Sequence, residues 1–360
     1  MLDSGSLIHM AALKATQCAA HATSLVPSHT HSALSGLFAV NKPANVTSTT
    51  ILDYLQRVCK RNKEHPLVKR VLELDGSKRA RRGLVKIGHG GTLDPLARGI
   101  VVVGMGSGCK KLHNMSASSK VYIAEARLGF SSTTLDCTGS LVDQAPTDHI
   151  TKDSVIQALK AFKGEINQTP PLYSALSMDG KRLYDYAREG IPLPREIPTR
   201  KVQIYSLDLL SYPDDNTAPD PSLKHLGFRA ENGLPGASST ESAQSTATVF
   251  DDGFKSKPTS STDPNHIAIP SSPQGIYFHI RVHCSSGTYI RTLIADIASH
   301  LGTVGHMTDL LRVEQSGFKL GGESTLEVGD CKDIEQVDRA IQAGNRIWEI
   351  REQKEAIPAA

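Results

Sequence analysis

The sequence predicts a fold of the α+β class, in which helices and strands are mixed around a sheet. Residues 276–284 alternate strictly between apolar and polar side chains, which is the pattern of a strand with one buried face. Residues 290–301 follow with apolar side chains at helical spacing, and residues 100–103 form a β-branched run typical of a buried strand. Because no strand–helix–strand unit repeats along the chain, we expect an α+β arrangement.

The N-terminal half predicts two helices and two strands. The first helix is expected over residues 47–58, capped by a Thr or Ser, with an apolar face formed by Ile51, Leu55 and Val58. Residues 121–128 form a second strand, which we expect to pair with residues 100–103. The second helix is expected where apolar residues recur at Val155, Ala158, Leu159 and Phe162, with Gly164 at its C-terminal end.

The C-terminal half predicts three elements and one long low-complexity segment. Residues 202–210 are strand-like and precede residues 213–275, which are rich in Ser, Thr, Pro, Asp and Gly. We expect this segment to be a disordered insertion, because it offers too little apolar surface to offset the entropy of ordering. The alternating strand follows, and then a helix whose first turn holds Tyr289 and Arg291.

These expectations divide the chain into four parts. Residues 1–35 form a disordered tail with one acid, one base and a weak targeting signal. Residues 36–212 and 276–320 form one domain, which residues 213–275 interrupt. Residues 321–360 form a short C-terminal extension.

Composition limits which binding partners and which cellular compartment suit the protein. The 360 residues carry 40 Lys and Arg against 37 Asp and Glu, a net charge of +3 that by itself favours no partner. Residues 60–86 hold a local excess of +7, which suits an RNA backbone, although a solvated basic surface or a nuclear-import signal fits as well. The six cysteines form no Cys-x-x-Cys pair, and no apolar stretch approaches about 18 residues. We expect an intracellular protein of the nucleus or mitochondrion, with the cytoplasm also open, and no membrane contact.

The segment GHGGTLDPLARG, residues 88–99, places a single carboxylate in a loop rich in glycine. His89 precedes Asp94 by five residues, and Arg98 follows it by four. The buried strand that comes next predicts a loop held by rigid structure, which is a common setting for chemistry. An aspartate that merely caps a turn fits the same local pattern.

This segment closely resembles the active-site motif of the TruB family, the pseudouridine synthases that act on uridine 55 in the T-loop of tRNA. Four further blocks resemble that family in the same order: FAVNKP (38–43) with Thr47 and Ser48, KVY (120–122) with ARLG (126–129), PPLYSAL (170–176) through YAREG (186–190), and SGTYIRTL (286–293) with LLR (310–312). The resemblance covers residues 38–318. It implies a mixed, largely antiparallel sheet with the active cleft across its middle.

Three features depart from the family pattern. Ser177 stands where members usually carry a lysine, which would remove one phosphate contact. Asn45 replaces a common glycine, which is tolerable because Asn accepts a left-handed conformation. Bacterial members carry a C-terminal RNA-binding PUA domain, and residues 321–360 are too few to form one. The resemblance therefore points to a eukaryotic branch without that domain.

The resemblance implies catalytic roles for three side chains. Asp94 would be the nucleophile, attacking either the sugar C1′ or the pyrimidine C6. Arg291 would hold this carboxylate through a bidentate contact and keep it ionised, although a phosphate contact fits Arg291 as well. Tyr122 would stack on the flipped uracil and assist removal of the proton from C5, the alternative being an ordinary core tyrosine.

The resemblance extends to six residues expected to bind the substrate: Lys42, His89, Tyr173, Tyr289, Leu311 and Arg312. The aromatic side chains would line the pocket or fill the gap left by the flipped base. Lys42 would touch a phosphate and Arg312 would face the RNA. Leu311 would form pocket wall, and a plain core leucine fits almost as well.

The predicted function is a tRNA pseudouridine synthase acting on uridine 55, an isomerase that needs no cofactor and no metal. T-loop-like sites in mRNA are further candidate substrates, and we expect a monomer that binds the tRNA T-arm without a guide RNA. The main alternative is a catalytically silent tRNA-binding or RNA-folding protein on the same fold. A nucleotide-cofactor site at residues 104–108 is disfavoured, because the glycine spacing there does not match a dinucleotide-binding loop.

Overall fold

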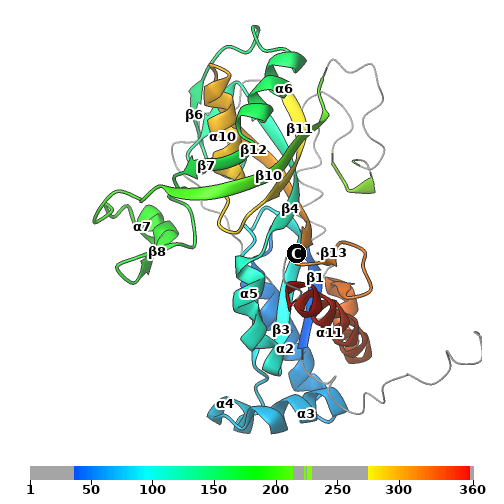
Figure 1. The fold of residues 1–360 in the computed structure, drawn as a ribbon. Coiled ribbons are helices and arrows are strands. Elements are labelled where there is room, and N and C mark those ends of the chain that lie inside the picture. The colour runs from blue at the N-terminus through cyan, green and yellow to red at the C-terminus, as the bar shows by residue number, and fades with distance from the viewer. Residues whose placement is uncertain (1–35, 214–222, 224, 229–274, 357–360) are drawn as a thin grey trace, which may run out of the picture. The chain divides into compact units, whose positions relative to one another are not determined.

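The computed structural model describes residues 36–213, 223, 225–228 and 275–356. The expected tail at residues 1–35 lies outside the described residues, as do residues 357–360 and most of the expected insertion. Among the described residues, ten strands form one mixed sheet with helices packed on both faces (Figure 1). The predicted α+β class is confirmed.

The main sheet is mixed and largely antiparallel, as expected. In its described part β1 runs parallel to β14 and β3 runs parallel to β12, while the other pairs are antiparallel. The strands follow the order β14 (Thr325–Glu327), β1 (Gly36–Lys42), β3 (Arg98–Met105), β12 (Gly305–Gln315), β4 (Lys120–Leu128), β11 (Tyr277–Cys284), β10 (Arg200–Ser211) and β7 (Gly164–Gln168), with β2 (Ile87–His89) on β3 and β13 (Phe318–Lys319) on β12.

Two small hairpins and a set of helices complete the described fold. The hairpins pair β5 (Phe130–Ser132) with β6 (Leu141–Gln144), and β8 (Ser177–Met178) with β9 (Lys181–Arg182). The helices are α2 (Ser48–Arg61), α3 (Pro66–Asp75), α4 (Lys78–Arg81), η1 (Gly106–Lys111), α5 (Leu112–Ala117), α6 (Lys152–Ala161), α7 (Leu183–Glu189), α10 (Ile290–His300), η2 (Val328–Lys332) and α11 (Ile334–Ala356). No described helix combines the length and the apolarity that crossing a bilayer requires.

Both long helices near the expected site form for the reasons read from the sequence. Thr47 caps α2 by accepting a hydrogen bond from the Thr50 amide at 3.1 Å, and the apolar face of α2 is buried. α2 ends at Arg61, three residues beyond the expected boundary. Tyr289 is the N-cap of α10, and the apolar side chains of α10 lie in the core.

One expected strand pairing is wrong. The sequence predicts that β4 pairs with β3, but β12 lies between them and β4 pairs with β12 and β11. The connection from β3 to β4 runs through η1 and α5 rather than a tight turn, so the two strands are not forced to be neighbours. Local sequence does not specify which distant strand fills the space between them.

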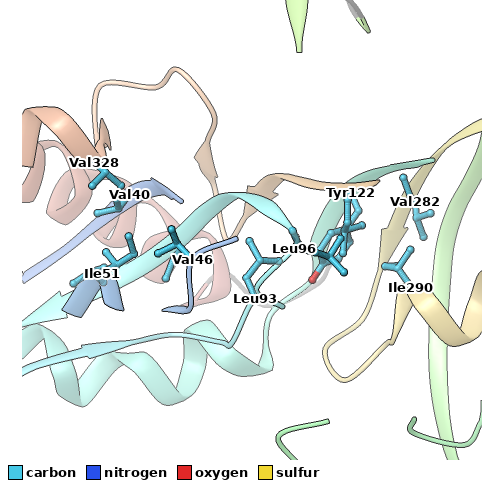
Figure 2. Close-up of a cluster of buried hydrophobic side chains, with 14 of the residues drawn as sticks. Val40, Val46, Ile51, Leu93, Leu96, Tyr122, Val282, Ile290 and Val328 are labelled. Carbon is cyan, nitrogen blue, oxygen red and sulfur yellow. The ribbon is translucent and has the colours of Figure 1, made fainter. Parts of the chain in front are cut away.

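The principal core cluster lies on one face of the sheet and continues beneath the loop that carries Asp94. Figure 2 shows this cluster extending from Val40 and Ile51, through Leu93 and Leu96, to Tyr122. Leu93 and Leu96 are 3% and 8% exposed, so the loop is fastened on both sides of Asp94. Burial of these leucines leaves the aspartate between them at the edge of the core.

The structure describes only a few residues of the segment that is expected to be a disordered insertion, 213–275. Leu223 and Phe228 are buried in a cluster with Ile123 and Leu311 on the other face of the sheet. The Arg98 guanidinium lies 4.5 Å from the centre of the Phe228 ring. An apolar side chain can therefore dock even from a segment with low average hydrophobicity, because burial depends on the individual residue.

Candidate active site

The loop between β2 and β3 presents Asp94 on a backbone that buried polar groups hold in place. The Ser48 hydroxyl accepts a hydrogen bond from the Leu93 amide at 3.0 Å and lies 3.2 Å from the Leu93 carbonyl. The Ala97 amide donates to the Asp94 carbonyl at 3.1 Å and closes the turn. The Asp94 side chain itself is 29% exposed. The backbone that carries the carboxylate is therefore held by hydrogen bonds, while the carboxylate itself is partly exposed to solvent.

Lys42 is part of this support and does not lie where a phosphate could reach it. It is fully buried, and its ammonium donates to the carbonyls of Pro43, Val46 and Pro95 at 2.9, 2.7 and 3.1 Å. These contacts use all three donors of the ammonium. Burial lowers the pKa of Lys42 to about 7, and the neighbouring Asp94 charge acts in the opposite direction. The expectation that Lys42 touches RNA is contradicted.

Arg312 holds the same loop from behind and is also buried, at 1% exposure. Its Nε donates to the Ile100 carbonyl at 2.6 Å, and its terminal nitrogens donate to the carbonyls of Thr92 and Gly91 at 3.5 and 3.3 Å. The backbone of Arg312 also lies so close to Gly99 that a Cβ there would be 2.3 Å from the Arg312 carbonyl oxygen. The expectation that Arg312 faces the RNA is wrong, because its donors are engaged inside the protein.

The predicted partnership of Asp94 with Arg291 is present. Arg291 Nε lies 2.9 Å from Asp94 Oδ2, and the Arg291 side chain is 4% exposed. The contact is single rather than bidentate, because the terminal nitrogens of Arg291 donate to the carbonyls of Thr134 and Tyr173, each at 2.8 Å. The guanidinium is thus fixed by two loops and offers one edge to the carboxylate.

A second carboxylate, which sequence reasoning missed, lies behind Arg291. Asp136 Oδ2 is 3.6 Å from Arg291 Nη1, and Asp136 is 4% exposed. Its Oδ1 accepts hydrogen bonds from the hydroxyls of Thr134 and Thr138 and from the Thr138 amide. The alternating Thr-x-Asp-x-Thr pattern signals a polar turn but does not show which cation the aspartate meets. Arg291 therefore lies between two carboxylates, one half-buried and one buried.

Tyr122 lies on β4, opposite Arg312 in the pairing of β4 with β12. Figure 2 shows its ring beside Leu96, with the hydroxyl oxygen directed toward the loop. Tyr122 is 7% exposed. Burial raises the pKa of Tyr122, and the Arg312 charge opposes that rise. The neutral phenol is therefore the favoured form of Tyr122.

The remaining candidates, Tyr289, Tyr173 and His89, differ in how the structure connects them to Asp94 and Arg291. Tyr289 is half-buried, and Gln168 holds its backbone through an amide contact at 2.7 Å and a carbonyl contact at 3.0 Å. Tyr173 contributes its carbonyl to Arg291. His89 is half-buried at the end of β2, and burial followed by the Arg312 charge lowers its pKa. His89 is therefore expected to be neutral.

Leu311 does not belong to the wall of this site. It is buried with Ile123, Leu223 and Phe228, whereas Tyr122 lies in the separate principal core. Adjacent residues of a strand point to opposite faces, so the step from Arg312 to Leu311 crosses the sheet. The expectation of pocket wall is wrong, and the core alternative is correct.

Several buried polar residues complete the site and were not singled out from sequence. Ser48 and Gln168 have the contacts given above, and the Gln315 amide donates to the carbonyls of Gly90 and Met115 at 2.5 and 2.8 Å. Such residues look like ordinary surface residues in a sequence. Only the position of the distant carbonyl shows why they are buried.

Comparisons with known proteins identify the family of the chain. Residues 78–224 match the family described as TruB family pseudouridylate synthase (N terminal domain). The chain is 32% identical to tRNA pseudouridine synthase 4 of Saccharomyces cerevisiae, covering 91% of this chain and 90% of that one. It is 33% identical to tRNA pseudouridine synthase 4 of Schizosaccharomyces pombe, with 82% of each covered, and 32% identical to pseudouridylate synthase TRUB1 of Homo sapiens, covering 80% of this chain and 62% of that one. The chain therefore belongs to the TruB family of pseudouridylate synthases.

Proposed function

We propose that this protein is a tRNA pseudouridine synthase that converts uridine 55 of the T-loop, with Asp94 as the nucleophile. The observation that carries the proposal is the 2.9 Å contact between a half-exposed Asp94 and a buried Arg291 that two carbonyls hold in place. The names of the two yeast relatives support tRNA as the substrate. T-loop-like mRNA sites present the same local shape and belong to the same proposal.

The chemistry is an isomerisation in which no atoms or electrons are exchanged with a cofactor. The N1–C1′ bond of uridine breaks, the base turns, and a C5–C1′ bond forms. The proton on C5 is lost and N1 gains one, so the atoms balance. A carboxylate suits the first step, because it can add to C1′ or C6 and can leave again.

The site residues divide this work. The target base must be extruded from its stack, which costs a few kcal/mol. Stacking of the extruded base on an aromatic ring such as that of Tyr122 offsets this cost by roughly 1–3 kcal/mol per base. Arg291 orients the attacking oxygen, and Lys42 and Arg312 keep the loop from moving.

The test is release of tritium from a tRNA transcript labelled at C5 of uridine, with the purified protein and RNA as the only macromolecules. We expect the native chain to release label, and Asp94→Asn to release none while keeping its tRNA affinity within a few-fold. Asp53→Asn, on the exposed side of α2, is the matched control and should behave like the native chain. Release of tritium by Asp94→Asn at the wild-type rate would show that Asp94 is not the nucleophile. Binding without turnover by the native chain would favour the catalytically silent RNA-binding alternative.

A further inference from the structure

Residues 60–86, which we name the basic surface, carry a local charge excess of +7. Its ten Lys and Arg side chains are all exposed, against three acidic residues in the same stretch. The proposed reaction uses none of them. A patch of this sign attracts a polyanion.

The local fold makes the basic surface outward-facing. The α3 helix buries its apolar side in the core, and Gly76 ends it in a left-handed conformation. Ser77 then caps α4, where Ala80 is buried and the four flanking basic residues point outward, namely Lys78, Arg79, Arg81 and Arg82. Within the described part of the chain, none of these four forms an ion pair, whereas Lys69 on α3 pairs with Glu64 at 2.8 Å.

The α2 helix spans the distance between the basic surface and the loop that carries Asp94. Its first residue, Ser48, is bonded to Leu93 beside Asp94, and its last turn carries Lys60 and Arg61. A helix of 14 residues is about 20 Å long. Figure 1 places α3 and α4 together, next to the far end of α2. RNA that reaches both places must extend about 20 Å beyond its target nucleotide.

We infer that the basic surface binds the sugar–phosphate backbone of the substrate RNA outside the stem-loop that presents the target uridine. This inference rests on the proposed function for the identity of the substrate. A duplex carries one phosphate charge per about 1.7 Å, so 20 Å of duplex offers on the order of ten phosphates. The three basic residues of α4 and its C-cap Arg82 lie in a capped turn anchored by the buried Ala80. This geometry suits a rigid array of phosphates better than a receptor that binds an extended basic peptide.

The experiment measures the affinity of two RNAs for three proteins over a range of salt concentrations. The RNAs are a full-length tRNA transcript and its isolated T-arm stem-loop. The proteins are the native chain, a quadruple variant of α4 (Lys78→Gln, Arg79→Gln, Arg81→Gln, Arg82→Gln), and a charge-matched control (Lys160→Gln, Arg339→Gln, Arg346→Gln, Lys354→Gln) altered at exposed residues of α6 and α11. Thermal unfolding confirms that each variant is folded.

The inference predicts that the α4 variant loses tenfold or more in affinity for full-length tRNA. The slope of log K against log salt should become shallower by about 3, since each phosphate contact contributes about 0.7–0.9. Affinity for the stem-loop should not change, and the control should match the native chain on both RNAs. An equal loss on both RNAs, or no loss on either, would overturn the inference. Turnover of the stem-loop by the native chain reports separately on the proposed function, because that reaction does not need the basic surface.

Discussion

Arg291 contacts two carboxylates, Asp94 and Asp136, and two backbone carbonyls, a combination that no other side chain could contact at once. Its guanidinium meets Asp94 through Nε and the carbonyls of Thr134 and Tyr173 through its terminal nitrogens. A lysine would keep the charge but has one nitrogen on a flexible stem, so it would lose the fixed direction toward the carboxylate.

We therefore expect Arg291→Lys to lower the single-turnover rate by roughly a hundredfold or more while leaving the protein folded. Circular dichroism and thermal unfolding provide the control for folding. A variant with the native rate would show that the ion pair does not orient the nucleophile.

Lys42 makes the free energy of unfolding of the chain depend on pH. The pKa of Lys42 is lowered to about 7 in the folded chain, against an ordinary value of 10.5. Between these two values the unfolded chain holds a proton that the folded chain has lost, so the free energy of unfolding rises with pH. We expect the native chain to gain about 2 kcal/mol over Lys42→Met between about pH 7 and pH 9.

Urea unfolding of both proteins across this pH range measures the difference, and other titrating groups cancel in the comparison. Parallel pH curves for the two proteins would contradict a depressed pKa at Lys42.

At the scale of elements, the start of β3 lies unusually close to β12. Gly99 has a φ of +105°, and a Cβ there would lie 2.3 Å from the Arg312 carbonyl oxygen. Backbone atoms cannot move aside as a side chain can. The contact brings Arg312 within reach of the Asp94 loop, so a glycine is required here for both conformation and space.

Gly99→Ala should therefore lower the free energy of unfolding by more than the penalty for placing an alanine at positive φ. The matched control is Gly76→Ala, at φ +59° with open space around the added Cβ, which should cost about 1–2 kcal/mol. We expect Gly99→Ala to exceed that cost by at least about 2 kcal/mol in urea unfolding, and turnover to fall with it. Equal losses at the two glycines would mean that the strands can separate without penalty.

At the scale of the whole molecule, the long segment between β10 and β11 is fastened to the sheet at one described point. Phe228 is 5% exposed, lies against Arg98, and meets the His279 ring edge-on at a centroid distance of 5.2 Å. Arg98 also forms an ion pair with Asp309 at 2.8 Å. The docked residues thus connect the segment to the strand that follows the Asp94 loop.

Phe228→Ala should lower the free energy of unfolding by about 3 kcal/mol, the usual loss for a buried phenylalanine. Tyr205→Ala provides an exposed aromatic control, at 52% exposure, and should cost less than about 1 kcal/mol. If the two variants unfold at the same urea concentration, Phe228 does not dock in solution.

Much of the fold could be predicted because it depends on local periodicity. The helix faces of α2 and α10 and the alternation of β11 follow from spacing alone. His279 is an exception within β11: it is buried, with its Nδ1 hydrogen-bonded to the Ser211 hydroxyl at 2.7 Å and its Nε2 3.4 Å from Glu125. Asn45 adopts the expected left-handed conformation at φ +61°. These features need only neighbouring residues, or the intrinsic freedom of one residue type.

The sequence by itself determined most of the elements, the family and the expectation that Asp94 meets Arg291, because hydrophobic spacing and motifs of contiguous residues are local properties. Only the tertiary structure decided the order of the strands, the docking of Phe228, and which cations are buried. The sequence predicts that Lys42 and Arg312 contact RNA, yet both lie in the core, because carbonyls of the Asp94 loop accept hydrogen bonds from them. A buried charge is tolerated only where such partners meet it, and that meeting exists only in the folded chain.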